Sequence, residues 1–126
     1  MNPGPAAAAA AYKTGYVEHA PPLKLVRMMY EGALRFLEQA ESAHAEGEVA
    51  RFQERCLRAN AVVGELRLSL DHRQAPELAS SLDALYLFCE SKVRRALVDG
   101  SSATIPSVRE VLNTLLDGWR RLEVES

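Results

Sequence analysis

The stretch that decides the fold runs Ala20-Pro-Pro-Leu-Lys-Leu-Val-Arg-Met-Met-Tyr-Glu-Gly-Ala-Leu-Arg-Phe-Leu-Glu-Gln-Ala40. Two prolines open it, and proline is tolerated in a first helical turn because its fixed φ suits a helix. Apolar residues then recur at alternating spacings of three and four, which predicts a helix from Pro21 or Pro22 to about Glu46. Gly47 follows as a residue that can take the left-handed conformation after a helix end.

This first helix carries two apolar stripes, which together exceed the ~100° face that a surface helix usually buries. Periodicity alone favours a simple explanation, in which the two stripes contact two neighbouring helices of a bundle. The other explanation is that one stripe holds a partner. The stripes are Leu23, Val26, Tyr30, Ala33, Leu37 and Ala40, and beside them Leu25, Met29, Gly32, Phe36, Ala40 and Ala43.

A second helix is predicted from about Glu48 to Leu70, again with two stripes. The main stripe keeps a strict spacing of three and four, which is typical of bundle packing. The second stripe has small residues between leucines, and this pattern suits either a groove or the close approach of another helix. The main stripe is Val49, Phe52, Cys56, Ala59, Val63, Leu66 and Leu70, and the second is Ala50, Leu57, Ala61, Gly64 and Leu68.

Two further helices complete the predicted fold. The third begins at Pro76 and ends at Asp99-Gly100, and the fourth follows a turn with three candidate N-caps, Ser102, Thr104, or Ser107 with Glu110 as a capping box. Four helices of about 30 Å with short connections predict an all-α, antiparallel four-helix bundle.

The predicted bundle domain spans residues 21–124. Residues 1–20 are rich in proline, glycine and alanine, and we expect a flexible N-terminal arm there. Its two aromatic residues, Tyr12 and Tyr16, suggest an arm that lays its tyrosines on the bundle.

Charge and composition exclude several classes of function. A net charge of −2 argues against nucleic acid as the main partner, since phosphate binding needs a basic surface. No stretch approaches the ~18 apolar residues of a spanning helix, and the chain start lacks a secretory signal, so we expect a cytoplasmic protein without membrane insertion. Cys56 and Cys89 each fall on an apolar stripe, which favours buried free thiols over a disulfide.

Catalytic and metal-binding residues are not gathered at the spacings that such sites need. His19, His44 and His72 have no histidine or cysteine at metal-ligand spacing, and Glu41, His44 and Glu48 would form a solvated face. No phosphate loop, nucleophile elbow or Glu-x-x-His pair occurs. The sequence therefore predicts no enzyme, metal or cofactor, and function is expected in apolar grooves.

Short motifs occur in a fixed order over about 110 residues, and together they are far more specific than any one alone. They are Ala11-Tyr12, Val17, Ala20 and Pro22 before the first helix; Leu25, Met28-Met29-Tyr30, Gly32-Ala33 and Ala40 within it; Arg58-Ala59, Val62-Val63, Glu65-Leu66 and Ser69-Leu70-Asp71 in the second; Glu77-Leu78-Ala79, Leu82, Leu85-Tyr86, Val93 and Ala96 in the third; and Val108, Glu110-Val111, Leu115-Leu116 and Trp119 in the fourth.

This pattern resembles the bacterial flagellar export chaperones of the FliS family. The resemblance is collinear from Ala11 to about Trp119. The chain departs from the family at His19 and Pro21, where members usually carry small hydroxyl residues, and at Leu97, where an asparagine is common.

The resemblance implies a cytoplasmic chaperone for flagellin, the filament subunit. Such a chaperone binds the disordered C-terminal segment of flagellin, prevents its premature polymerisation and delivers it to the flagellar export gate. The segment folds into short helices in apolar grooves of the bundle. The family also implies that the N-terminal arm can cover part of this surface, and it leaves room for a regulatory partner, either an anti-sigma factor or a flagellar assembly factor.

Combining the stripes with the resemblance, we expect a groove for flagellin and a lid made by Tyr12 and Tyr16. The alternative is a non-enzymatic bundle whose extra apolar stripe drives homo-oligomerisation. The predicted groove residues are Leu25, Met29 and Phe36 of the first helix, and Leu57, Ala61, Gly64 and Leu68 of the second.

Overall fold

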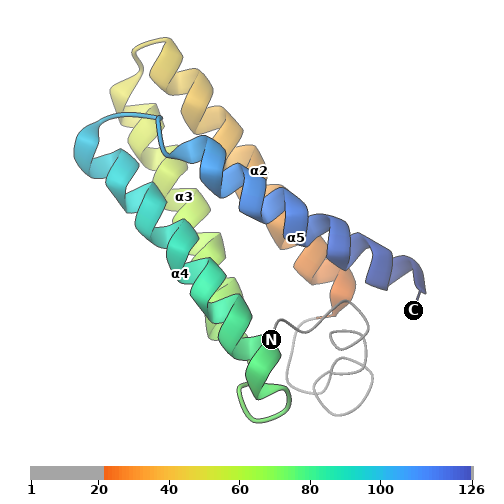
Figure 1. The fold of residues 1–126 in the computed structure, drawn as a ribbon. Helices are drawn as coiled ribbons and strands as arrows, with labels where there is room; N and C mark the ends of the chain where they lie inside the picture. Colours follow the sequence, from red (N-terminus) through yellow and green to blue (C-terminus); the bar gives the residue numbers. More distant parts are fainter. Residues whose placement is uncertain (1–21, 126) are drawn as a thin grey trace.

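The computed structural model describes residues 22–125, which form four helices joined by short connections. They are α2 (Leu23–Ala45), α3 (Val49–Leu68), α4 (Pro76–Asp99) and α5 (Ile105–Glu125). Successive helices run in opposite directions (Figure 1), which confirms the all-α four-helix bundle. The predicted arm, with Tyr12 and Tyr16, lies outside the described residues.

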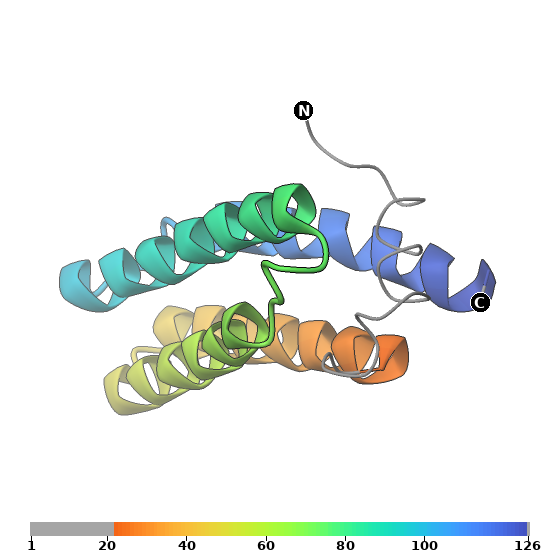
Figure 2. The same cartoon turned by 90° about the horizontal axis from the view of Figure 1, so that it is seen from below.

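The bundle has two layers. α2 packs against α3 and α5, and α4 packs against the same two helices. Figure 2 shows α2 and α3 in one layer and α4 and α5 in the other. α2 and α3 therefore share an outer face that points away from the second layer. Within residues 22–125, no helix has the length and apolar content needed to cross a membrane.

The helix ends predicted at glycines are confirmed. Gly47 after α2 and Gly100 after α4 have φ of 74° and 60°, the left-handed region that glycine enters without a steric penalty. At Gly47 the chain turns so that the N–H of Glu48 donates to the carbonyl of Ala43 at 2.9 Å. This bond satisfies a carbonyl that the end of α2 would otherwise leave without a partner.

Two glycine substitutions are expected to change stability in opposite directions. Gly47→Ala places a Cβ in a left-handed conformation and should destabilise the fold by about 1 kcal/mol. Gly64→Ala adds a Cβ inside α3 with no atom within 4 Å, so it should stabilise by up to about 1 kcal/mol through helix propensity. Thermal unfolding followed by circular dichroism should give melting temperatures on either side of the wild-type value. A shift of both in one direction would contradict this assignment.

α3 is shorter than predicted, because it ends at Leu68 and not at Leu70. The Ser69 hydroxyl donates to the carbonyl of Leu66 at 2.7 Å, a local bond that competes with continuation of the helix. Leu70 still packs against the core from the connection that follows.

The start of α5 also differs from one of the three predictions. The helix begins at Ile105, so Ser107 lies inside its first turn and the Ser107–Glu110 capping box is wrong. The Ser107 hydroxyl donates to the carbonyl of Thr104 at 2.7 Å. Thr104 stands at the N-cap position, but its own hydroxyl donates to the carbonyl of Lys92 at 2.7 Å and ties the turn to α4.

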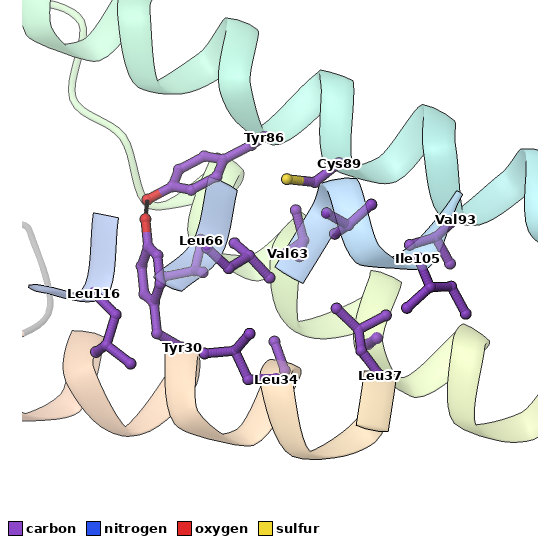
Figure 3. Close-up of a cluster of buried hydrophobic side chains, with 14 of the residues drawn as sticks. Tyr30, Leu34, Leu37, Val63, Leu66, Tyr86, Cys89, Val93, Ile105 and Leu116 are labelled. Atoms are coloured by element: carbon purple, nitrogen blue, oxygen red, sulfur yellow. Dashed lines mark hydrogen bonds between the residues drawn. The ribbon is translucent and has the colours of Figure 1, made fainter. Parts of the chain in front are cut away.

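The main stripes of the four helices meet in one core (Figure 3). Val49 does not join this core, although the spacing places it on the main stripe of α3: it is 65% exposed, because it is the first residue of the helix, one turn before Phe52. The largest contributors to the core are Val26, Tyr30, Leu34 and Leu37 of α2; Phe52, Cys56, Val63 and Leu66 of α3; Leu82, Tyr86, Cys89 and Val93 of α4; and Ile105, Val108, Leu112, Leu116, Trp119 and Leu122 of α5.

Two tyrosine hydroxyls pair with each other in the core. The hydroxyls of Tyr30 and Tyr86 lie 2.7 Å apart and link α2 to α4 across the core (Figure 3). Burial raises the pKa of Tyr30 and keeps it neutral. The predicted free thiols are confirmed: Cys56 and Cys89 are buried and unbridged, and burial raises the pKa of Cys56 to about 11 and that of Cys89 to about 12.

Candidate functional site

An open apolar groove of about 400 Å³ lies between α2 and α3. We call it the α2–α3 groove. Residues from both helices line it and all but one of them are apolar. They are Leu25, Met28, Met29 and Gly32 of α2, and Ala61, Val62 and Glu65 of α3.

Small residues at the middle of each helix create the hollow. Gly32 has no side chain, and a Cβ placed there would meet no atom within 4 Å. Ala61 stands across from it on α3 and is exposed. Leu25 and Met28 are 45% and 51% exposed, so large apolar side chains border the hollow without filling it. Apolar surface gathered around a concavity is typical of a binding site.

Three of the predicted groove residues come together here: Leu25, Met29 and Ala61. Met29 lines the groove and also packs against the core, so it is only partly exposed. Leu25 and Ala61 are exposed. The second stripe of α2 therefore provides both part of the α2–α3 groove and part of the α2–α3 packing.

The other predicted residues of α3 lie beside the groove and do not line it. Leu57 and Leu68 are 59% and 78% exposed, and Gly64 between them is partly exposed. Within residues 22–125 no helix covers this second stripe of α3. The explanation that each stripe contacts a neighbouring helix is therefore wrong for α3.

Phe36 does not line the groove, contrary to the expectation from its stripe. It is partly buried and packs against the core. The guanidinium of Arg55 lies 5.3 Å from the centre of its ring, and the same group donates to the side chain of Gln39 at 3.0 Å. The Phe36 ring therefore forms part of the α2–α3 contact.

Four lining residues were not predicted as groove residues: Met28, Gly32, Val62 and Glu65. Met28 lies three residues after Leu25 and four before Gly32, so the helical spacing alone would have identified it. Val62 follows Ala61 on the side of α3 that faces α2. Glu65 belongs to the motif Glu65-Leu66, but a charged residue is not expected in an apolar lining, so it was not predicted there.

The charges of α3 near Phe36 are neutralised within the chain. Glu54 accepts a hydrogen bond from Arg58 at 2.9 Å and another from Arg55. Burial works to raise the pKa of Glu54, but these hydrogen bonds outweigh it and lower that pKa. In this part of α3 the carboxylate is therefore paired with basic side chains of the same helix. Glu65, in contrast, adds a carboxylate to the lining of the groove.

Residues 22–125 contain no group of three or more His, Cys, Asp or Glu side chains placed to hold a metal ion. His44 has a structural role: its Nε2 lies 3.1 Å from the carbonyl of Gly100, and its ring contacts that of Phe52. His19 lies outside the described part of the chain. The geometry therefore supports binding of an apolar partner.

Comparison with known proteins agrees with this geometry. The family model for flagellar protein FliS matches residues 5–126. The chain belongs to the FliS family. The flagellar secretion chaperone FliS of Bacillus subtilis is 25% identical over 111 residues, which cover 88% of this chain and 82% of that protein. FliS of Campylobacter jejuni is 31% identical over 101 residues, covering 80% of this chain and 79% of its own.

A third FliS relative, the flagellar secretion chaperone FliSB of Pseudomonas aeruginosa, is 27% identical over 103 residues, 82% of either protein. The FliS match extends from the N-terminal segment to the end of α5. The resemblance stated from the sequence motifs is thereby confirmed.

Proposed function

We propose that this chain is a flagellar export chaperone that holds the disordered C-terminal segment of flagellin in the α2–α3 groove. Its relatives are named flagellar secretion chaperones, and flagellin is the client that this role implies. The observation that carries the proposal is the groove: Leu25 and Met28 are left about half exposed around a hollow, whereas the core-facing residues of the same helix are buried.

The binding mode follows from the shape of the groove. A client segment that folds into an amphipathic helix can place large apolar side chains over Gly32 and Ala61. Each Å² of apolar surface removed from water contributes roughly 25 cal/mol, and ordering the client offsets part of this gain. The result is specific but reversible binding, which suits a cargo that must be released for export.

The role of the chaperone follows from the chemistry of the client. Flagellin segments that pair as helices in the filament expose the same apolar faces before export. Covering these faces in the cytoplasm prevents premature polymerisation, and the complex is then delivered to the flagellar export gate. A regulatory partner, either an anti-sigma factor or a flagellar assembly factor, would respond to whether flagellin occupies the groove.

The N-terminal arm completes the proposal as a lid. Tyr12, and with it Tyr16, covers part of the apolar surface of the 21–124 bundle until flagellin displaces it. Leu57 and Leu68 beside the groove are exposed leucines that such an arm or the client would cover. Coverage of this kind lowers the risk of aggregation through an exposed apolar patch.

The experiment that tests the proposal is calorimetric titration of the protein with the C-terminal ~40 residues of flagellin from the same organism. Helicity is followed in parallel by circular dichroism. We expect saturable one-to-one binding with a gain in helix, because the client folds as it binds. No heat and no gain in helix at tens of micromolar would refute the proposal.

The alternative function is homo-oligomerisation through the same exposed stripe of α3, and the exposure of Leu57 and Leu68 is the observation in its favour. It requires a dimer or larger assembly at micromolar concentration and no affinity for flagellin. Size-exclusion chromatography with light scattering distinguishes the two functions, since the chaperone is expected as a monomer or weak dimer.

A further inference from the structure

Glu65 is the one charged residue in the lining of the α2–α3 groove, and it is exposed. The other six lining residues are apolar. An acidic side chain on such a surface weakens binding to any wholly apolar partner. Its position therefore needs an explanation that a purely hydrophobic groove does not provide.

Within residues 22–125, no cation is paired with this carboxylate. A glutamate on a helix is usually paired by a basic residue three or four positions away. At those distances from Glu65 the sequence has Ala61, Val62, Leu68 and Ser69. Within residues 22–125 its side chain takes part in no hydrogen bond or ion pair.

The neighbouring cations of α3 are already engaged. Arg58 donates to Glu54 at 2.9 Å, and Arg67 donates to Glu90 of α4 at 2.8 Å. These two pairs use the basic side chains on either side of Glu65 in the helix. Within residues 22–125, neither of these arginines can neutralise Glu65 without breaking the pair that it already forms.

A helix that occupies the groove removes water from the Glu65 carboxylate. Removing water from a charged group costs free energy, and this cost is not recovered unless the group gains a partner of opposite charge. A ligand that covers the carboxylate without providing such a partner therefore binds weakly. The groove therefore discriminates among amphipathic helices by the residue that comes to lie over Glu65.

We infer that the client helix presents a lysine or arginine to Glu65, so that Glu65 determines both the register of the helix in the groove and the choice of segment. This inference rests on the proposed function, and it names the chemistry of the occupant: an apolar helical face with a basic residue at its edge. An acidic residue at that edge is rejected by like charge.

Charge substitution at Glu65 tests the inference with the C-terminal ~40 residues of flagellin as the probe. Glu65→Gln is expected to weaken binding about threefold, and Glu65→Lys about tenfold, at low salt. The difference should shrink at high salt, because a partly exposed pair is screened. Glu110→Lys on α5 is the matched control: it makes the same charge change in the other layer and should leave the affinity unchanged.

Exchanging the charges then identifies the flagellin residue that pairs with Glu65. Each lysine and arginine of the flagellin segment is replaced in turn by glutamate, and one of these variants should bind Glu65→Lys several-fold more tightly than it binds the wild type. Failure of every flagellin variant to show this rescue overturns the inference, as does equal binding by wild type and the Glu65 variants. In both cases the proposed function stands, since wild type still binds. Absence of binding by the wild type overturns the proposed function and the inference together.

Discussion

Replacing Met28 by aspartate is expected to weaken binding of the flagellin C-terminal segment at least about thirtyfold, with the helix content unchanged. Met28 is 51% exposed at the border of the α2–α3 groove, so the bundle does not depend on its burial. A bound helix would cover an aspartate at this place and leave its charge without water or a cation. Calorimetry measures the affinity, and far-UV circular dichroism measures the helix content.

Val98→Asp provides the matched control for this substitution. Val98 is 79% exposed on α4, in the layer opposite the groove, and the change again introduces one aspartate on a helix surface. We expect the affinity of this variant to equal that of wild type. If Met28→Asp binds as tightly as Val98→Asp, the client does not occupy the α2–α3 groove. If Met28→Asp unfolds, Met28 belongs to the core.

Replacing Leu37 by alanine is expected to lower the free energy of unfolding by about 3 kcal/mol, within the range of 2–5 kcal/mol seen for buried leucines. Leu37 of α2 is completely buried in the core (Figure 3). Leu57→Ala makes the same chemical change at a side chain that is 59% exposed, and it should cost less than about 0.5 kcal/mol. Urea unfolding followed by circular dichroism gives both values.

Comparing the loss of stability at these two leucines shows which apolar stripe is part of the core and which is an exposed binding face. Both lie on apolar stripes of the sequence, and only the structure shows that one stripe is buried and the other is not. Equal losses of stability for Leu37→Ala and Leu57→Ala would mean that the second stripe of α3 is packed in the protein. The exposed face that the proposed function needs would then be absent.

The fold was predictable because burial imposes a regular spacing on the sequence. Each main stripe keeps the spacing of three and four, and residues such as Tyr30, Val63 and Val93 are buried as that spacing requires. The ends at Gly47 and Gly100 were predictable because only a glycine enters the left-handed region freely. Periodicity and glycine position are local properties of the chain, so one sequence is enough to read them.

The end of α3 and the start of α5 depend on bonds that periodicity does not encode. The Ser69 hydroxyl, at the end of α3, bonds to the carbonyl of Leu66. The Thr104 hydroxyl bonds to α4, through the carbonyl of Lys92, and so does not act as the cap that its position suggested. The Ser69 bond is local and the Thr104 bond reaches another helix, but each hydroxyl has several possible partners, and the spacing of apolar residues does not report which one it takes.

The groove was only partly predictable, because the second stripe of α2 changes role along its length. Near the short connection to α3, Ala40 and Ala43 are buried, since small side chains let the two helices approach. Phe36 is covered by Arg55, and Leu25, farthest from the connection, is exposed. This change depends on what the neighbouring helix places against each position, and no pattern within a single helix reports it.

The central claim is that the α2–α3 groove holds the flagellin segment, and the methionine methyl groups test it most directly. The chain has three methionines, and two of them, Met28 and Met29, line the groove. In protein labelled with ¹³C only at methionine methyls, Met→Leu substitution assigns each signal. We expect the Met28 and Met29 signals to shift saturably at one equivalent of the flagellin segment. Unchanged Met28 and Met29 signals at saturating flagellin would contradict the claim.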